Sequence, residues 1–154
     1  NFRLYSKNLR TGEEKTIVDV TENFIWTADP HVSWGQYTVY QVDRSVYVYD
    51  METQTSKKLF THEPGWDLYN YKIMDGHVIA ICGTENVCRV WAIDIADEVV
   101  TELDTRSGNV MIFSTDYECD GYFKGLLTEP SGNVEVCYIS KEDFYRSNYD
   151  GAFH

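Results

Sequence analysis

Three loops of this 154-residue chain carry side chains whose types and spacing could recognise a ligand. They lie at 26–31, 61–67 and 105–109, between segments that alternate apolar and polar residues. Exposed Trp and Arg often anchor interfaces, and Trp beside carboxylates suits sugars and peptides. The opposite interpretation, that both tryptophans pack between layers of structure, stays open. The predicted ligand-binding residues are Trp26, Asp29, His31, His62, Trp66, Asp67 and Arg106.

The signals for catalysis or metal binding are weak. His31 and His62 could act as a general base or a metal ligand, although ordinary loop or strand-end positions account for both better. Residues 116–121 read DYECDG, like the opening of a calcium loop, but the twelfth position is Leu127 where such a loop carries Glu. The sequence has no GxSxG, P-loop or dinucleotide glycine pattern. We therefore predict no catalytic residue, no metal and no cofactor.

The loops recur because the segments that flank them recur. A similar segment begins near residues 4, 46, 90 and 136. In each copy, alternating apolar and polar residues lead to a polar anchor residue and then to a polar turn. Such a period is typical of arrays whose units each bury too little surface to stand alone. The anchors are 42, 44 and 46 residues apart, at Asn8, Asp50, Asp94 and Ser140.

Period-two alternation within each unit predicts antiparallel strands. Val46 and Val48 lie opposite Tyr47 and Tyr49, so both faces are apolar and these strands are expected between layers. The predicted strands are 2–8, 13–18, 31–34, 37–42, 45–50, 56–60, 69–74, 77–82, 87–94, 98–103, 109–115, 122–128, 134–140 and a weak one at 143–147. We expect almost no helix. A single helical turn within 21–26 is left open as an alternative.

Glycine turns separate the first two strands of each complete unit. Gly35, Asp75-Gly76 and Asp120-Gly121 each follow one predicted strand and precede the next. Asp-Gly is a strong hairpin signal because tight hairpin turns need positive φ at their central residues. The repeated turn therefore explains the DYECDG sequence without calcium.

The sequence VYVYDMETQTSKKL at 46–59 resembles the third and fourth strands of β-propeller blades of the TolB-like and WD-repeat-like kind. The resemblance covers nearly the whole chain and implies an all-β fold of four-stranded antiparallel blades. It implies one β-propeller segment, 1–154, with a partial blade at 1–20 and blades at 21–62, 63–106 and 107–154. About three and a half blades would form an incomplete ring. Tyr-rich repeats of this type also resemble bacterial envelope proteins, which implies an extracytoplasmic location, with the cytoplasm as the alternative.

An incomplete ring would expose apolar sheet faces and strand edges, which favour association. We therefore expect self-association or pairing with the rest of a larger propeller. A fold alone does not fix a function. The expected function is a non-catalytic module that binds a protein, peptide or glycan through its inter-blade loops. The alternative is the propeller portion of a larger hydrolase or lyase whose catalytic residues lie outside this chain.

The charge balance argues against two classes of partner. Thirteen Lys and Arg against 25 Asp and Glu give a net charge of −12, and residues 78–154 carry −9 of it. Such a surface repels phosphate backbones and anionic lipid. No apolar run is long enough to span a bilayer. We expect neither nucleic acid nor membrane insertion.

The four cysteines have no zinc-ligand spacing. Cys82 and Cys88 flank a predicted turn, so a cross-strand disulfide is one interpretation. Buried free thiols are the other, since free Cys is commonly buried.

Overall fold

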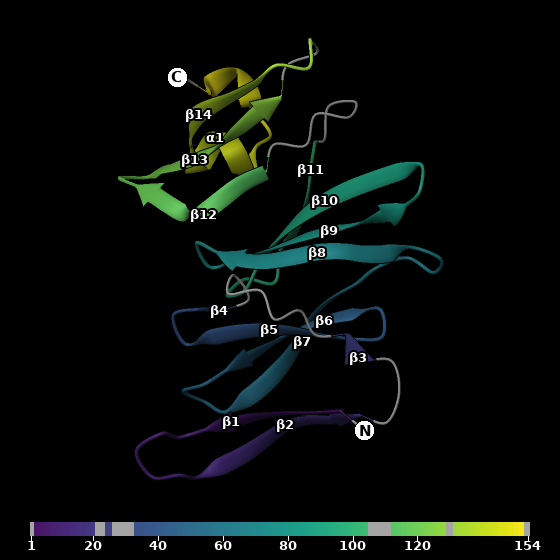
Figure 1. Ribbon diagram of the computed structural model, residues 1–154, viewed down its shortest axis with the longest axis vertical. Helices are drawn as coiled ribbons and strands as arrows, with labels where there is room; N and C mark the ends of the chain where they lie inside the picture. Colours follow the sequence, from purple (N-terminus) through teal and green to yellow (C-terminus); the bar gives the residue numbers. More distant parts are fainter. Residues whose placement is uncertain (1, 21–23, 26–32, 105–111, 129–130, 153–154) are drawn as a thin grey trace.

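The chain forms antiparallel sheets stacked face to face along its long axis, in a computed structural model that describes residues 2–20, 24–25, 33–104, 112–128 and 131–152 (Figure 1). The all-β prediction is confirmed. Successive strands pair with their neighbours in sequence, except at the start of the second sheet, where two short strands both pair with the third; apart from that start, the sheets are meanders. Figure 1 shows the first and last sheets at opposite ends of the stack, and the described residues do not close a ring.

The first sheet pairs β1 (Phe2–Lys7) with β2 (Glu14–Val20). The second contains β3 (Phe24–Ile25), β4 (Ser33–Trp34), β5 (Tyr37–Val42), β6 (Ser45–Asp50) and β7 (Thr55–Thr61). The third contains β8 (Asp67–Met74), β9 (His77–Thr84), β10 (Val87–Asp94) and β11 (Val100–Leu103). The fourth contains β12 (Ile112–Cys119), β13 (Tyr122–Thr128) and β14 (Val134–Ser140), followed by α1 (Lys141–Tyr145) and a 3-10 turn, η3 (Tyr149–Gly151).

The Asp-Gly hairpins form as predicted. Asp75 and Gly76 have φ of 49° and 71° between β8 and β9, and Asp120 and Gly121 have φ of 46° and 87° between β12 and β13. Two consecutive residues with positive φ define the tight turn that matches strand twist. The backbone of the DYECDG sequence is therefore a hairpin. The side chains of its residues 116–119 lie outside the described set.

The four anchors of the repeat share one local role. Asn8, Asp50 and Asp94 each accept hydrogen bonds through Oδ1 from the backbone N–H groups two and three residues later, at 2.8–3.2 Å. Ser140 Oγ accepts the N–H three residues later, from Asp143, at 3.0 Å. A short acceptor side chain of this kind starts a turn by satisfying its first amides. The repeated anchor is therefore a turn initiator.

The first three of these turns also close alike. The fourth residue after each anchor has a left-handed backbone: Gly12, Gln54 and Glu98 have φ of 76°, 56° and 59°. Glycine adopts this conformation without steric cost, whereas Gln and Glu pay for it. The turn geometry is thus retained even where its residue type is unfavourable.

The fourth turn continues into a helix, so the predicted strand at 143–147 is wrong. Ser140 caps α1, and Glu142 and Asp143 lie in its first turn, where acidic side chains favour the helix dipole. Asp143 also accepts a hydrogen bond from the Ser140 hydroxyl at 2.7 Å. A helical turn within 21–26 is wrong at residues 24 and 25, which form β3, and its other residues lie outside the described set.

Two apolar cores lie on opposite faces of the third sheet. In β9, Val78 and Ala80 face the second sheet while Ile79 faces the fourth. The core between the second and third sheets contains Val39, Val46, Val48, Tyr71, Ile73, Val78, Ala80, Cys82, Ile93 and Ile95. The core between the third and fourth contains Met74, Ile79, Val90, Ala92, Leu103, Phe123, Cys137, Ile139 and Phe144. The prediction that strands with apolar residues on both faces lie between layers is confirmed for the third sheet.

Polar links also join neighbouring sheets. Lys15 lies seven residues after the first anchor and donates from Nζ to the Gln54 carbonyl oxygen in the next turn, at 2.7 Å. Lys57 lies seven residues after the second anchor and reaches the third turn, at 2.7 Å from Glu98 Oε1 and 3.4 Å from the Ile95 carbonyl oxygen. Each lysine therefore connects its own sheet to the turn of the next.

Of the two interpretations of Cys82 and Cys88, the cross-strand disulfide is wrong, because neither residue is in a disulfide; the alternative of buried thiols holds for Cys82 and not for the exposed Cys88. Cys82 is paired in register with Arg89, so the neighbouring Cys88 points to the opposite face of the sheet. Cys82 lies in the core and Cys88 is exposed. Burial, together with nearby Cys88, raises the pKa of Cys82 to about 12.

No helix within the described ranges has the length and hydropathy that a membrane crossing needs.

Candidate ligand-binding groove

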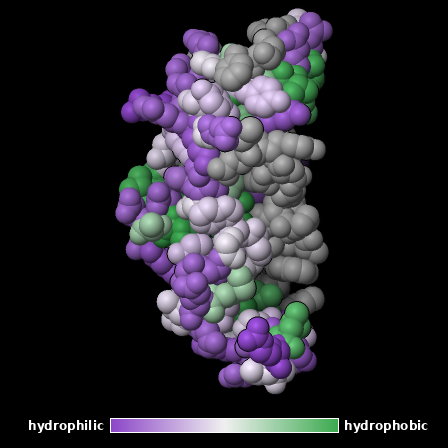
Figure 2. Space-filling view, turned by 90° about the vertical axis from the view of Figure 1, so that its left-hand side faces the viewer, coloured by the Kyte–Doolittle hydropathy of each residue, from purple (hydrophilic) through white to green (hydrophobic). Residues whose placement is uncertain are grey.

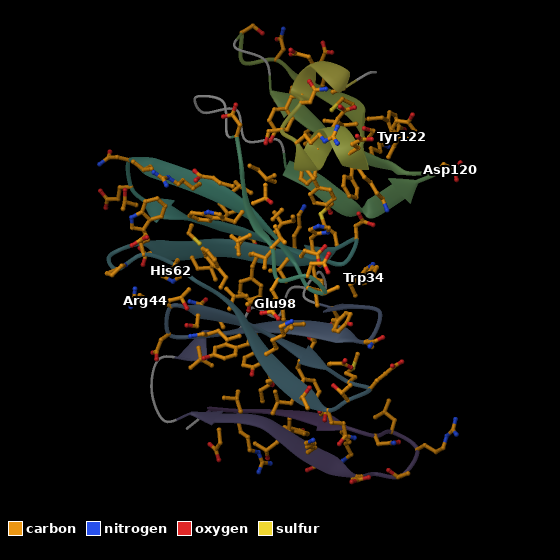
Figure 3. The ribbon with its side chains drawn as sticks, turned by 180° about the vertical axis from the view of Figure 1, so that it is seen from behind. Trp34, Arg44, His62, Glu98, Asp120 and Tyr122 are labelled. Atoms are coloured by element: carbon orange, nitrogen blue, oxygen red, sulfur yellow. The ribbon has the colours of Figure 1, made fainter. Side chains whose placement is uncertain are left out.

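A groove of about 700 Å³ lies at one end of the second and third sheets. The β5–β6 turn, the end of β7 and the start of β8 surround it. Its size is typical of small-ligand sites. Figure 3 shows two of its residues, Arg44 and His62, side by side at this end, with Trp34 at the opposite end. The lining residues are Gln41, Asp43, Arg44, Ser45, Thr61, His62, Trp66, Asp67 and Leu68.

A turn in the loop between β7 and β8 positions the aromatic side of the groove. Trp66 N donates to the Glu63 carbonyl oxygen at 3.2 Å, across Pro64 and Gly65. Proline fixes φ at the second turn position, and Gly65 supplies the positive φ of 81° that the third requires. The sequence EPGW thus folds back locally and brings Trp66 to the groove.

A reciprocal pair of hydrogen bonds joins the two sides. His62 N donates to the Arg44 carbonyl oxygen, and Arg44 Nη1 donates to the His62 carbonyl oxygen, both at 3.0 Å. The β5–β6 turn is therefore fixed against the end of β7. Since one guanidinium N–H is used in this contact, the remaining Arg44 donors are available to a ligand.

His62 is buried, with 4% of its surface exposed. Its Nδ1 lies 3.3 Å from the Glu63 carbonyl oxygen, which can only accept. The neutral ring therefore carries its hydrogen on Nδ1, and Nε2 is left as an acceptor. Nε2 is buried and has no hydrogen-bond partner in the part of the chain that the structure describes.

Gln41 is the second buried polar side chain, with 3% exposed. Its Nε2 donates to the Asp43 carbonyl oxygen, and this contact fixes the orientation of the amide because that oxygen cannot donate. Oε1 is then a buried acceptor with no described partner. A buried polar atom without a hydrogen bond costs stability, so this oxygen calls for a physical explanation.

Two carboxylates lie at the rim of the groove. Asp43 and Asp67 are both exposed, and neither carboxylate has a hydrogen-bond or ion-pair partner among the residues described. Across the strands, Ser45 Oγ and Thr61 Oγ1 are hydrogen-bonded to each other at 2.8 Å. The rim thus combines two anionic groups with a hydroxyl pair.

Trp66 is half-buried and belongs both to the groove and to the stack. Its ring packs against the core between the second and third sheets, with the Trp91 ring centroid at 5.9 Å. The Arg89 guanidinium lies over the ring at 5.3 Å from its centroid. The two interpretations of this tryptophan, packing and ligand contact, are therefore compatible.

Three of the seven predicted residues come together here: His62, Trp66 and Asp67. The other four, Trp26, Asp29, His31 and Arg106, lie outside the described residues. Sequence reasoning missed Gln41, Asp43 and Arg44. A signal existed, because a meander places the turn between the strands predicted at 37–42 and 45–50 at the same end as the loop at 61–67.

A second polar cluster, at the other end of the third sheet, has a structural role. Lys141 Nζ lies 2.5 Å from Asp75 Oδ1, and the Tyr145 ring stacks on His77 at 4.1 Å between centroids. Both pairs hold α1 against the β8–β9 hairpin. The surface at this end is mostly hydrophilic, with hydrophobic residues in small separate patches (Figure 2).

No set of three His, Cys, Asp or Glu side chains within the described ranges is arranged to hold a metal ion. No family model, curated protein or solved structure matches the chain.

Proposed function

We propose that this protein is a non-catalytic binding scaffold that holds a polar ligand, of the peptide or glycan class, in the groove beside His62 and Trp66. The observation that carries the proposal is the pair of buried acceptors, Gln41 Oε1 and His62 Nε2, which no described residue satisfies. Because both atoms are buried, a ligand would reach them by displacing the side chains that cover them, and would then supply the missing donors. Most of the groove is preformed by turns and by the reciprocal Arg44–His62 contact, which lowers the entropic cost of binding.

We further propose that the stacked sheets are blades of an open β-propeller arc. The recurring meander of the second and third sheets, their face-to-face packing and the shared turn initiators support this assignment. In such folds, ligands are held by the loops at one end of the blades. The groove lies at the end that holds the β5–β6 turn and the β7–β8 loop. An extracytoplasmic location is part of this proposal, and cell fractionation of the natural host tests it.

Self-association through the outer face of the fourth sheet is the proposed mode of assembly. This face exposes apolar side chains at alternate positions of the paired strands, namely Tyr122, Leu126, Val134 and Val136. The outer face of the first sheet is instead polar, with the Lys7–Glu14 ion pair and Arg3 over Tyr5. Sedimentation velocity at micromolar concentration should show dimers that Leu126→Lys converts to monomers. A monomeric wild type would refute this mode.

Filling the groove tests the binding proposal. Thr61→Trp adds a bulky ring at an exposed rim position without replacing the buried floor. Thr101→Trp, at an exposed position of β11, is the matched control. In a screen of peptides and glycans monitored by histidine ¹⁵N chemical shifts, ligands that shift the His62 signal should bind Thr101→Trp normally and Thr61→Trp at least tenfold more weakly. Equal binding to both variants would place the ligand elsewhere.

A further inference from the structure

The groove contains more hydrogen-bond acceptors than donors. Gln41 Oε1 and His62 Nε2 are buried acceptors, and the carboxylates of Asp43 and Asp67 accept at the rim. The donor on the other side is Arg44, one of whose N–H groups is already bonded to the His62 carbonyl oxygen. From this imbalance, and resting on the proposed function, we infer that the ligand is a peptide segment whose guanidinium or ammonium side chain enters the groove.

The two buried acceptors determine the sign of the ligand group. Gln41 Nε2 is hydrogen-bonded to the carbonyl oxygen of Asp43, and His62 Nδ1 to that of Glu63. These two contacts fix the orientations of the side chains. With these contacts in place, Gln41 presents Oε1 and the tautomer of His62 that donates from Nδ1 presents Nε2, so both side chains offer an acceptor. A guanidinium carries five N–H donors and no acceptor, so it matches such a floor.

The rim and the whole-molecule charge favour the same ligand. Asp43 and Asp67 have no described cationic partner, and the net charge is −12. Paired carboxylates hold guanidinium through charge-assisted hydrogen bonds. A strongly negative surface also raises the association rate of cations and lowers that of anions.

Trp66 provides a precedent within the molecule. Its ring already carries a guanidinium, that of Arg89, at 5.3 Å from the centroid. Cation–π contacts of this kind favour Arg over neutral side chains. The ring face that Arg89 covers is occupied, so Trp66 shows only that an indole of this protein accepts a guanidinium.

Arg44 completes the match to a peptide. Its remaining guanidinium donors suit the backbone carbonyl oxygens that flank a bound side chain. A neutral glycan offers hydroxyl groups that donate and accept alike, so it would gain nothing from the two unpaired carboxylates. A polyanion would meet Asp43 and Asp67 at close range. The combination of four acceptors and one cation thus selects a basic peptide.

The probe is the peptide acetyl-Gly-Gly-Arg-Gly-Gly-amide, and its control is the same peptide with citrulline, which keeps the shape of arginine but has no charge. Binding to the full chain is measured by isothermal titration and by the ¹⁵N shift of His62 Nε2. The arginine peptide should bind at least about tenfold more tightly than the citrulline peptide. Its affinity should fall as salt rises from 50 to 500 mM, since exposed ion pairs are screened.

Isosteric variants locate the effect. Asp43→Asn and Asp67→Asn remove one negative charge each, and Asn tolerates the left-handed φ of 51° at position 43. Each should weaken the arginine peptide about fivefold, the upper range for an exposed ion pair. Asp97→Asn changes the net charge equally at an exposed turn at the opposite end and should have no effect beyond about 1.5-fold.

The outcomes separate this inference from the proposed function. Equal binding of the arginine and citrulline peptides would overturn the basic-peptide inference. It would also be overturned if Asp97→Asn weakened binding of the arginine peptide as much as Asp43→Asn. A neutral peptide or glycan that shifts His62 while the arginine peptide does not would overturn it too and leave the binding scaffold standing. If no peptide or glycan shifts His62, both are refuted.

Discussion

Adding one methyl group at Gly83 is expected to destabilise the fold severely. Gly83 lies in β9, paired with Cys88 of β10. A Cβ at this position would lie 1.9 Å from the Val87 carbonyl oxygen and 3.0 Å from the Cα of Cys88. Both are backbone atoms of the neighbouring strand, so no side-chain rotation can relieve the contact. In Gly83→Ala the two strands must separate at the end of the hairpin.

The size of the effect follows from that separation. A carbon–oxygen contact needs about 3.3 Å, so the strands must part by more than about 1 Å. About two ladder hydrogen bonds would be lost, at about 1 kcal/mol each. The neighbouring Cys82, which is fully buried, would be displaced from its packing at a further cost of about 1–2 kcal/mol. The total of about 3–4 kcal/mol corresponds to a melting temperature lower by about 6–16 °C for a chain of this size.

Thermal unfolding followed by far-ultraviolet circular dichroism is the assay, with Gly151→Ala as the matched control. A Cβ at Gly151 would lie 2.7 Å from Asp143 Oδ2, the end of a side chain that Ser140 and Asn148 hold by hydrogen bonds. Moving this carboxylate would weaken those hydrogen bonds and leave the strands paired, so the melting temperature of Gly151→Ala should fall less than that of Gly83→Ala. Because the β9–β10 hairpin carries Arg89 over Trp66, Gly83→Ala should also shift tryptophan emission to the red. A Gly83→Ala protein that melts within about 2 °C of wild type would refute the reasoning.

Three further predictions concern other parts of the stack. Phe144→Ala should lower the free energy of unfolding in urea by about 3–5 kcal/mol, because this buried ring packs edge-on against Phe123; a loss under about 1 kcal/mol would contradict the assigned core. Hydrogen bonds from Ser140 and Asn148 lower the pKa of Asp143 in the folded protein. The contribution of Asp143 to the free energy of unfolding is therefore fully present above its unfolded pKa of about 3.9, and it is lost as the pH falls through the lower folded pKa. Urea unfolding between pH 2 and 7 should therefore show a flatter acid limb in Asp143→Asn, and an unchanged limb would refute this. The exposed Cys88 should react with a thiol reagent at pH 8 while Cys82, with its pKa raised to about 12, should not; Cys88→Ser should remove one fast-reacting equivalent, and an undiminished count would contradict the assignment.

The sequence predicted the strands well because their signal is local. Period-two alternation and Asp-Gly turns fix where a strand begins and ends, and β5 and β6 coincide with the predicted 37–42 and 45–50. The failure came at α1. The repeat predicted a fourth strand after Ser140. Ser140 and Asp143 also form a helix-capping pattern, and this pattern determines the structure that forms.

The groove could be predicted only in part, for a different reason. Its aromatic and acidic residues stand in a loop, where Trp66 and Asp67 are conspicuous. Its floor is formed by Gln41 inside a strand, and nothing in the alternation distinguishes a buried glutamine from an exposed one. Its cation, Arg44, is recognisable only after the turns of neighbouring strands are placed at one end. The predicted strand order places the Arg44 turn at the right end of the sheet, but the burial of Gln41 depends on three-dimensional packing that the strand order does not specify.

The lysine links between sheets bear on how such a protein could grow. Lys15 reaches the main-chain oxygen of Gln54, an atom that every residue type possesses, and Lys57 makes a comparable contact with the oxygen of Ile95. The receiving turn can therefore change its side chains without losing the attachment. The corresponding position of the third unit is Thr101, so this attachment joins the first three sheets, and a duplicated first or second unit would bring its own lysine with it.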